Sequence, residues 1–361
     1  MRNERKSMNI DIYQQLQKQL DQYSMGFPAT QSGIEIRILK YLFSEADAKL
    51  FTQLTPRLET PETVASRLGR PVAEVASQLD EMAEKGLLFR LNKGGESRYG
   101  AIPFVHGLYE FQVKDLKADF AELAKQYFEE AFDKAMQQGA DYFLRTIPVQ
   151  KSIEVTRNVA SYDDAVEICR SKPFIVITDC ICRKTAALTE QDCGKPREAC
   201  FMFGSMAQYY LDRGMGRKIS LEEAIRILDE CREAGLVTQP ATAQNPSGMC
   251  NCCGDCCGVL RALNKHPRSA ELVFSNHYAV VEADACTACE ICLDRCQMEA
   301  ITMDNDLAVV SRDRCIGCGL CVITCPDQAL KLVPKSAQDL RTPPVSMLEQ
   351  MMLMARKRGV I

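Results

Sequence analysis

Hydrophobic positions in the first third of the chain recur at helical spacing and then alternate. Between residues 34 and 54 apolar side chains return every three or four positions, which predicts two short amphipathic helices. Thr60 followed by Pro61 is the expected N-cap and first residue of another helix. Residues 87–100 alternate around a glycine turn like a hairpin. The apolar stripe before this hairpin consists of Val72, Val75, Leu79 and Met82.

The order helix, helix, hairpin over residues 31–104 resembles the winged-helix family of transcription regulators, and a short polar helix is expected before it within residues 1–30. The resemblance implies DNA binding through a helix in the major groove. That helix is acidic here, with Glu74, Asp80, Glu81 and Glu84 against a single Lys85. Phosphate neutralisation requires lysine and arginine, so we expect no DNA partner and interpret the unit as a docking or structural module. DNA contact through the basic residues of the hairpin is the alternative.

The remaining segments, taken with this unit, predict a multidomain α+β protein. Residues 105–150 have the apolar spacing of a helical bridge, with a linker or edge strand expected over 145–158. A buried strand at 173–179 lies between helical patterns in residues 151–277, which predicts a cysteine-rich α/β domain. Residues 278–335 contain short β-branched runs, and residues 336–361 end in a methionine-rich amphipathic helix. Such a tail either docks on a partner or a membrane surface, or packs back on its own domain.

Composition narrows the possible functions. The 361 residues include 19 cysteines, only three histidines and no tryptophan, so a histidine-based catalytic site is not expected. The net charge of −4 provides no general attraction to nucleic acid or acidic lipid. The first residues lack the apolar run of a signal peptide, and no segment is long and apolar enough to span a bilayer. We therefore expect a cytoplasmic protein of an anaerobic or low-oxygen cell, with cysteines kept reduced for metal.

Two cysteine runs in residues 278–335 share the spacing C-x2-C-x2-C-x3-C. A loop of this kind wraps three thiolates around one iron–sulfur cube, and its fourth cysteine ligates the other cube. The spacing predicts that one [4Fe-4S] cluster is held by Cys286, Cys289, Cys292 and Cys325. It predicts that the second is held by Cys315, Cys318, Cys321 and Cys296. Structural zinc is the alternative, but two tandem runs with this spacing favour iron and sulfide.

This segment resembles the bacterial dicluster ferredoxins, and the resemblance covers little more than residues 278–335. Short strands are expected before each run, at 278–282 and 307–310, and after each run, at 300–303 and 329–332. One residue departs from the family pattern. Cys325 is followed by Pro326, but Cys296 is followed by Gln297, whose backbone N–H proline lacks. We expect the first loop to be hydrogen-bonded differently from the second.

A second group of cysteines lies in the preceding segment: Cys180, Cys182, Cys193, Cys200, Cys250, Cys252, Cys253, Cys256 and Cys257. Five of these nine fall within residues 250–257, and thiolates this dense repel one another unless a cation binds them. We expect one further Fe–S cluster, although two are numerically possible. A structural zinc site and a redox-active dithiol are the alternatives. Arg183 and Lys184 are expected beside the cluster, and Cys169 and Cys231 in the core.

The region also looks similar to a cysteine-rich segment found next to ferredoxin domains in uncharacterised iron–sulfur proteins of anaerobes. Its C-C-G element is similar to a motif of heterodisulfide reductase subunits, but the long spacings of that family are missing, so its activity is not transferred. No dinucleotide, P-loop or flavin fingerprint is present. The sequence therefore predicts an electron carrier for a redox partner protein. A redox-sensing winged-helix regulator and a catalytic reductase using residues 180–257 are the alternatives.

Overall fold

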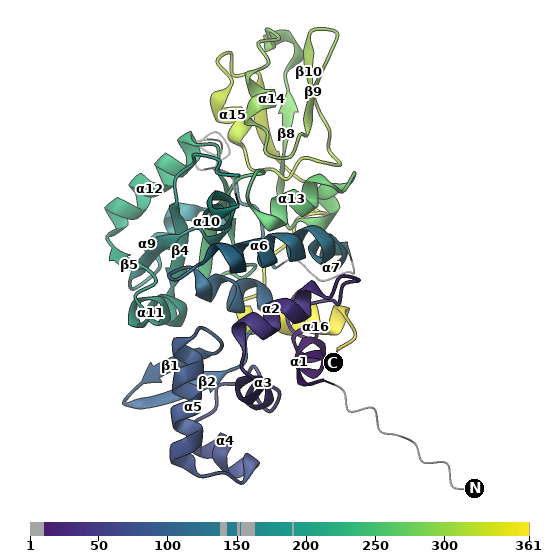
Figure 1. Cartoon of the computed structure of the whole chain (residues 1–361). Coiled ribbons are helices and arrows are strands. Elements are labelled where there is room, and N and C mark those ends of the chain that lie inside the picture. The colour runs from purple at the N-terminus through teal and green to yellow at the C-terminus, as the bar shows by residue number, and fades with distance from the viewer. Residues whose placement is uncertain (1–10, 138–142, 150–151, 153–162, 190, 361) are drawn as a thin grey trace, which may run out of the picture.

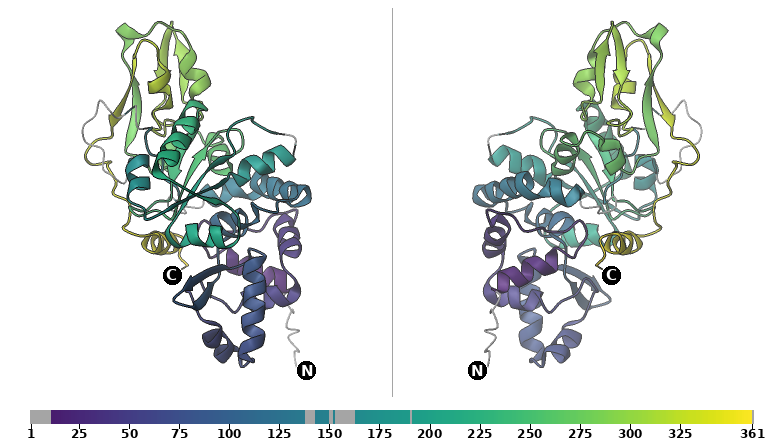
Figure 2. Two further views of the ribbon diagram at one scale, coloured as in Figure 1. Left: turned by 90° about the vertical axis from the view of Figure 1, so that its left-hand side faces the viewer. Right: turned by 90° about the vertical axis from the view of Figure 1, so that its right-hand side faces the viewer.

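Three groups of elements follow one another along the long axis of the molecule (Figure 1). The computed structural model describes residues 11–137, 143–149, 152, 163–189 and 191–360. An N-terminal helical unit occupies one end, an antiparallel sheet with helices occupies the middle, and a small unit of two antiparallel strand pairs occupies the other end. The side views preserve this order (Figure 2). The start of the chain and most of the linker expected at 145–158 lie outside the described residues.

The N-terminal unit has the helices and the hairpin that the hydrophobic pattern predicts. Its helices are α1 (Ile12–Leu20), α2 (Ile34–Leu42), α3 (Glu45–Phe51), α4 (Pro61–Leu68) and α5 (Val72–Glu84). Thr60 caps α4 by accepting a hydrogen bond from the N–H of Thr63. Strands β1 (Phe89–Lys93) and β2 (Glu96–Gly100) are joined by Gly94 and Gly95, which both have positive φ, as a two-residue hairpin turn requires. Membership of the winged-helix family stays a prediction.

The bridge is helical but broken, where the sequence pattern suggested one long helical stretch. It consists of η1 (Phe104–Leu108), η2 (Glu110–Gln112), α6 (Ala118–Tyr127), η3 (Phe128–Phe132) and α7 (Asp133–Gln137). The first break occurs because Val105 is extended and His106 has a left-handed φ of 59°. Apolar spacing identifies the residues that face the core, but it does not reveal such changes of backbone direction. Helix α6 packs against both α2 and α10 (Ile181–Leu188), and so joins the N-terminal unit to the central sheet.

The central sheet has five strands in the order β5-β3-β4-β7-β6. They are β3 (Ile175–Asp179), β4 (Glu198–Phe203), β5 (Arg217–Ile219), β6 (Val237–Pro240) and β7 (Gly248–Cys252). Helices α9 (Ala165–Arg170), α11 (Gly204–Asp212) and α12 (Leu221–Glu233) accompany it. Every pairing is antiparallel, so this domain is α+β rather than the expected α/β. The sequence analysis interpreted the cysteines of β4 and β7 as metal ligands and did not predict these two strands. As predicted, Cys169 and Cys231 are buried in the core.

The C-terminal unit, with two antiparallel strand pairs, confirms the four strands expected around the cysteine runs. Strand β8 (His277–Val281) pairs with β11 (Leu330–Pro334), and β9 (Ile301–Asp304) pairs with β10 (Leu307–Val310). Each cysteine run continues into one short helix, α14 (Ile291–Arg295) or α15 (Leu320–Thr324). Helix α13 (Gly258–Asn264) and the short turns η5 (Ser269–Leu272) and η6 (Ala283–Ala285) complete this part.

The tail helix α16 (Met347–Lys357) packs against the N-terminal unit (Figure 1). In the part of the chain that the structure describes, it does not pack against the C-terminal unit that precedes it in the sequence. Met354 is fully buried in the N-terminal hydrophobic core. Arg358 Nη2 lies 3.4 Å from Asp21 Oδ1, and its Nη1 donates to the carbonyl of Ser24. Among the described residues, no helix combines the length and apolar character needed to cross a membrane.

Candidate metal centres

The nine cysteines of the central domain form two separate groups. Six of them line one cavity and are named here the six-thiol cavity: Cys180, Cys182, Cys200, Cys250, Cys252 and Cys257. The other three, Cys193, Cys253 and Cys256, have their sulfur atoms within 4.8 Å of one another. The sequence predicted that all nine contribute to metal binding, but it did not show which cysteines belong to which group. The division depends on which loops the fold brings together.

The sheet register places the six thiols. Cys200 in β4 lies opposite Cys250 in β7, so neighbouring strands bring these two side chains together. Cys252 points to the same face as Cys250 because side chains of a strand alternate. Cys180 lies where β3 ends, and Cys182 in the first turn of α10. Cys257 precedes α13 as its N-cap residue.

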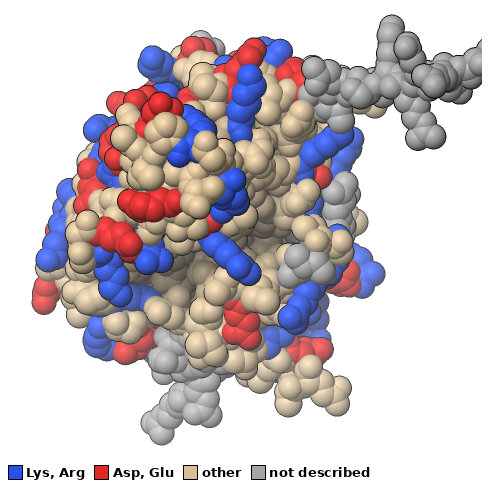
Figure 3. Space-filling view, turned by 90° about the horizontal axis from the view of Figure 1, so that it is seen from below, with Lys and Arg blue, Asp and Glu red and all other residues tan. Residues whose placement is uncertain are grey.

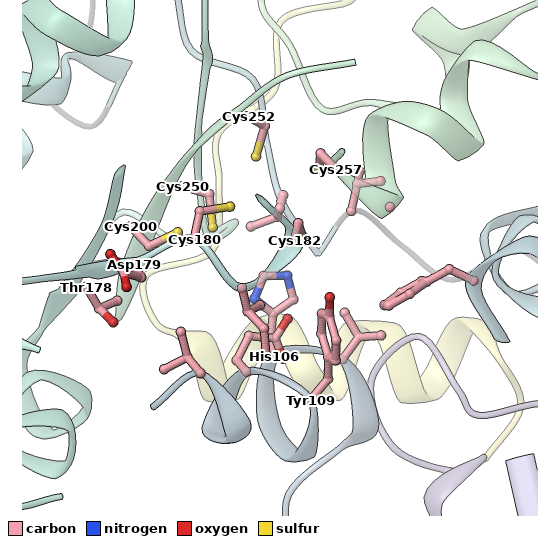
Figure 4. A pocket seen from close by; sticks show the side chains of 18 of the residues that line it. His106, Tyr109, Thr178, Asp179, Cys180, Cys182, Cys200, Cys250, Cys252 and Cys257 are labelled. Atoms are coloured by element: carbon pink, nitrogen blue, oxygen red, sulfur yellow. The ribbon is translucent and has the colours of Figure 1, made fainter. Parts of the chain in front are cut away.

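The opposite wall of the six-thiol cavity comes from the bridge, which the sequence analysis treated as a scaffold. Figure 4 shows the sulfur atoms of Cys180, Cys200, Cys250 and Cys252 on one side of the cavity and His106 and Tyr109 on the other. The cavity encloses about 670 Å³ of empty space, including its mouth. The only sequence signal for this wall was that His106 is one of three histidines in the chain.

Two ionisable groups on this wall are neutral at pH 7. Burial lowers the pKa of His106 to about 4. Burial raises the pKa of Glu110 to about 8, although the N–H of Gly107 donates to its carboxylate at 3.0 Å and opposes the shift. Tyr109 shares a 2.8 Å hydrogen bond with Thr185. The cavity therefore places six thiols opposite a protonated carboxylic acid and a neutral imidazole.

Arg183 is a fully buried cation with no carboxylate partner among the described residues. Its Nη1 and Nη2 donate to the carbonyls of Pro196 and Asn251 at 2.9 and 2.7 Å, and its Nε has no hydrogen-bond partner in the described structure. Burial alone would lower the pKa of Arg183, but the neighbouring thiols of Cys180 and Cys253 outweigh it and raise the pKa. A buried charge without a counter-charge is costly. Thiolate–metal centres would supply that counter-charge, so these residues fit anionic clusters.

Lys184 was expected beside the same thiols, and both of its described partners line the six-thiol cavity. Its Nζ lies 3.6 Å from Asp179 and donates to the carbonyl of Val113 at 2.7 Å. Lys184 thus has a carboxylate partner, whereas Arg183 has none among the described residues.

The eight cysteines of the C-terminal unit surround two cavities, four in each. One cavity is lined by Cys286, Cys289, Cys292 and Cys325. The other is lined by Cys296, Cys315, Cys318 and Cys321. In each cavity the fourth cysteine comes from the other run, which is the grouping that the spacing suggests. Ligation of clusters by these two sets stays a prediction.

Backbone N–H groups point at several of these sulfur atoms. Ala300 N donates to Cys296 Sγ at 3.3 Å and Ala329 N to Cys325 Sγ at 3.2 Å, at the same position of the two runs. Such donors favour thiolates and influence cluster potential. Burial raises the pKa of the Cys318 thiol to about 12, so its thiolate requires a bound metal.

The two cysteine loops differ in how deeply they are enclosed. Ala288 and Glu290 adopt left-handed conformations in the first loop, where Gly317 and Gly319 do so in the second. A side chain at Gly317 would collide with the carbonyl of His277, and one at Gly319 with Ser152. The second loop is thus pressed against the rest of the chain, whereas Cys289 of the first loop is exposed.

A family model described as a 4Fe-4S dicluster domain matches residues 285–330. The C-terminal unit is an iron–sulfur module. The match covers both four-cysteine cavities and none of the cysteines of the central domain. No curated protein and no solved structure matches the chain.

The dicluster domain docks on the central domain through Gln297, the residue that replaces the family's usual proline. Gln297 Oε1 accepts a 2.7 Å hydrogen bond from the N–H of Gly254, and its carbonyl accepts one from Asn264 Nδ2 at 2.9 Å. Gly254 allows this approach, because a Cβ there would lie 2.8 Å from the Gln297 carbonyl oxygen. The sequence analysis expected the backbone N–H of Gln297 to make the difference, whereas the described hydrogen bonds use its side-chain and carbonyl oxygens.

One hydrophobic cluster connects the two sets of thiols. Cys252 and Cys257 of the six-thiol cavity are buried in it, and Cys296, Cys315 and Cys318 of the dicluster domain pack against it. The second four-cysteine cavity therefore adjoins the central domain, and the first lies farther out.

Proposed function

We propose that this protein is a cytoplasmic iron–sulfur electron carrier with three cluster sites. The two four-cysteine cavities each hold a [4Fe-4S] cluster, and the six-thiol cavity holds a further Fe–S cluster. The observation that carries the proposal is that six thiols line one buried cavity beside the dicluster domain. When bound, the clusters supply one-electron transfer, and the chain holds them, shields them from water and spaces them.

The placement of the cavities supports an order of electron transfer. The first cavity is the outer station, because Cys289 is exposed and the neighbouring Ile291 is 45 % exposed. A redox partner protein exchanges electrons there. The second cavity is the middle station, and the six-thiol cavity is the inner one.

Substitution of inner cysteines tests the third cluster. The full chain is purified anaerobically as wild type, Cys180→Ser and Cys250→Ser, with Cys169→Ser as a control that changes a buried thiol outside both groups. We expect the two site variants to lose one cluster, on the order of four iron and four sulfide, while the dicluster EPR signals persist. Unchanged iron and sulfide in both variants, with the control folded, would show that the cavity holds no cluster.

The far wall of the cavity favours a second candidate function, a catalytic reductase. Glu110 carries a proton at neutral pH and faces the thiols together with His106 and Tyr109, an arrangement suited to delivering protons where electrons arrive. Coupling between Glu110 and the potential of the inner cluster distinguishes this function from simple relay.

A further inference from the structure

The three cysteines outside the six-thiol cavity come from two loops. Cys193 lies in the loop between α10 and β4, and Cys253 and Cys256 lie between β7 and α13. Cys253-Gly-Asp-Cys256 is a C-x2-C turn, the spacing with which a short loop grips a single metal ion from two sides. None of the three is needed by the relay proposed above.

Their sulfur atoms are spaced for one ion. Cys193 Sγ and Cys253 Sγ are 3.9 Å apart, and all three sulfur atoms lie within 4.8 Å of one another. Two thiolates at 2.3 Å from a tetrahedral ion are about 3.8 Å apart. An Fe–S cube holds each thiolate on a different iron atom and spreads them more widely. The spacing therefore favours a single ion over a cube.

Charged residues fasten the two loops together around these sulfur atoms. Lys195 forms an ion pair with Asp255, which joins the loop of Cys193 to the turn between Cys253 and Cys256. Asp192 accepts hydrogen bonds from the N–H of Gly194 at 3.2 Å and from Arg197 at 3.1 Å, which shape the first loop. The buried guanidinium of Arg183, whose Nε has no hydrogen-bond partner in the described structure, lies close enough to Cys253 to affect its charge.

We propose that Cys193, Cys253 and Cys256 hold one thiophilic divalent ion, Zn²⁺, at a site separate from every Fe–S cluster. No fourth histidine, cysteine or carboxylate joins the group among the described residues, so a water molecule or another small ligand completes the tetrahedron. The ion fixes the 250–257 loop, whose remaining cysteines line the six-thiol cavity. It thus orders a ligand-bearing loop without carrying electrons.

Metal content of the full chain tests this site. Protein grown with both iron and zinc is purified anaerobically as wild type and Cys193→Ser, with Cys231→Ser as the control, since that buried thiol belongs to neither group. We expect about one zinc per chain in the wild type and in the control. Cys193→Ser is expected to lose at least nine-tenths of the zinc and to keep its iron and sulfide.

Cobalt provides a second readout that does not depend on stability. Protein loaded with Co²⁺ in place of zinc should show the thiolate-to-metal absorption of a tetrahedral site. This absorption should vanish in Cys193→Ser and return, shifted, in Cys193→His, because histidine is also a zinc ligand. Loss of iron and sulfide together with Cys193, or absence of zinc from the wild type, would assign these thiols to a cluster instead. A Cys193–Cys253 disulfide that forms when oxygen is admitted to wild-type protein purified without zinc would make the two thiols a redox pair and overturn the zinc site. If the wild type contains zinc but no cluster in the six-thiol cavity, only the proposed relay is overturned, because zinc is measured separately from iron and sulfide.

Discussion

At the scale of single residues, the buried charges show what the cavity requires. Arg183 has no carboxylate within ion-pair distance in the described structure, yet it lies among cysteines of both groups. On the wall of the six-thiol cavity, Glu110 has a pKa of about 8 because burial disfavours its carboxylate. An anionic cluster in this cavity would stabilise the guanidinium and would further disfavour the carboxylate. Of the two residues, Arg183 is the one that indicates negative charge among the cysteines.

We expect Glu110 to make the potential of the proposed inner cluster dependent on pH. Its pKa is about 8 from burial, and an anionic cluster beside it would move the pKa higher. Above that pKa the carboxylate charge opposes addition of an electron, so reduction is accompanied by proton uptake. We expect the midpoint potential to be flat up to at least pH 8 and then to fall by up to about 59 mV per pH unit. EPR-monitored redox titration measures it.

Glu110→Gln should remove this slope, because glutamine does not titrate. Asp179→Asn is the matched control, since Asp179 lines the same cavity but is already paired with Lys184. Its variant should keep the slope. A potential that is independent of pH in the wild type would remove Glu110 as a proton donor and with it the reductase interpretation.

At the scale of elements, cysteine groups set by local spacing could be predicted, whereas groups set by contacts between distant segments could not. The grouping of the eight cysteines in the dicluster domain could be anticipated because most ligands of a cube lie within one loop, and the spacing encodes its wrapping. The division of the other nine could not, since it follows from the register of Cys200 with Cys250 and from contact between distant loops. Strands β4 and β7 escaped notice because cysteine, methionine and glycine do not alternate as typical strand residues do.

The docking element of the dicluster domain is equally non-local. The sequence marked Gln297 as a departure from the family pattern, but only the fold reveals its partner, the N–H of Gly254 in the cysteine-rich loop. His106 was missed for a related reason. Its position on the cavity wall depends on the break in the bridge, which apolar spacing does not encode.

Replacing Gln297 by proline, the residue at the equivalent Pro326, tests this contact. The variant loses the side-chain acceptor for Gly254 but keeps the carbonyl that binds Asn264. We expect all clusters to remain and electron transfer between the dicluster domain and the inner cluster to slow severalfold, because the looser contact holds the two sites less closely together. Freeze-quench EPR after rapid reduction resolves the two signals.

Gln297→Glu is the informative comparison, because it preserves an acceptor at the same position and should transfer electrons at nearly the wild-type rate. If the proline variant transfers electrons at the wild-type rate, the Gln297 contact does not position the dicluster domain for electron transfer.

At the scale of the whole molecule, the chain reaches from one end to the other and returns. The dicluster domain is at the end opposite the N-terminal unit, and α16 then packs on that unit, where Met354 enters its core. Seen from the end that carries the N-terminal unit, basic and acidic side chains are intermixed (Figure 3). No extended basic face is visible there of the kind that nucleic-acid binding requires.

Ion pairs within the N-terminal unit account for most of its basic residues near the hairpin. Arg90 lies 3.2 Å from Asp80 and 2.7 Å from Glu84, and Arg98 lies 2.7 Å from Glu96. Two of the three cations of the hairpin, Arg90 and Arg98, are therefore already partnered by acidic side chains of α5 and of the hairpin itself. This arrangement favours a docking or structural role over a redox-sensing regulator.

The last prediction is that the full-length holoprotein does not bind duplex DNA at physiological salt. Fluorescence anisotropy with a random-sequence duplex should give no saturable binding at 0.15 M ionic strength, about the physiological value. The double variant Glu74→Lys, Glu81→Lys is the positive control, because it reverses two exposed charges on α5. It should bind weakly, with an affinity that falls steeply as salt is raised. Selection of a defined sequence by the wild type, lost when the clusters are oxidised, would establish the regulator instead, since only a cluster-gated groove helix would couple the two.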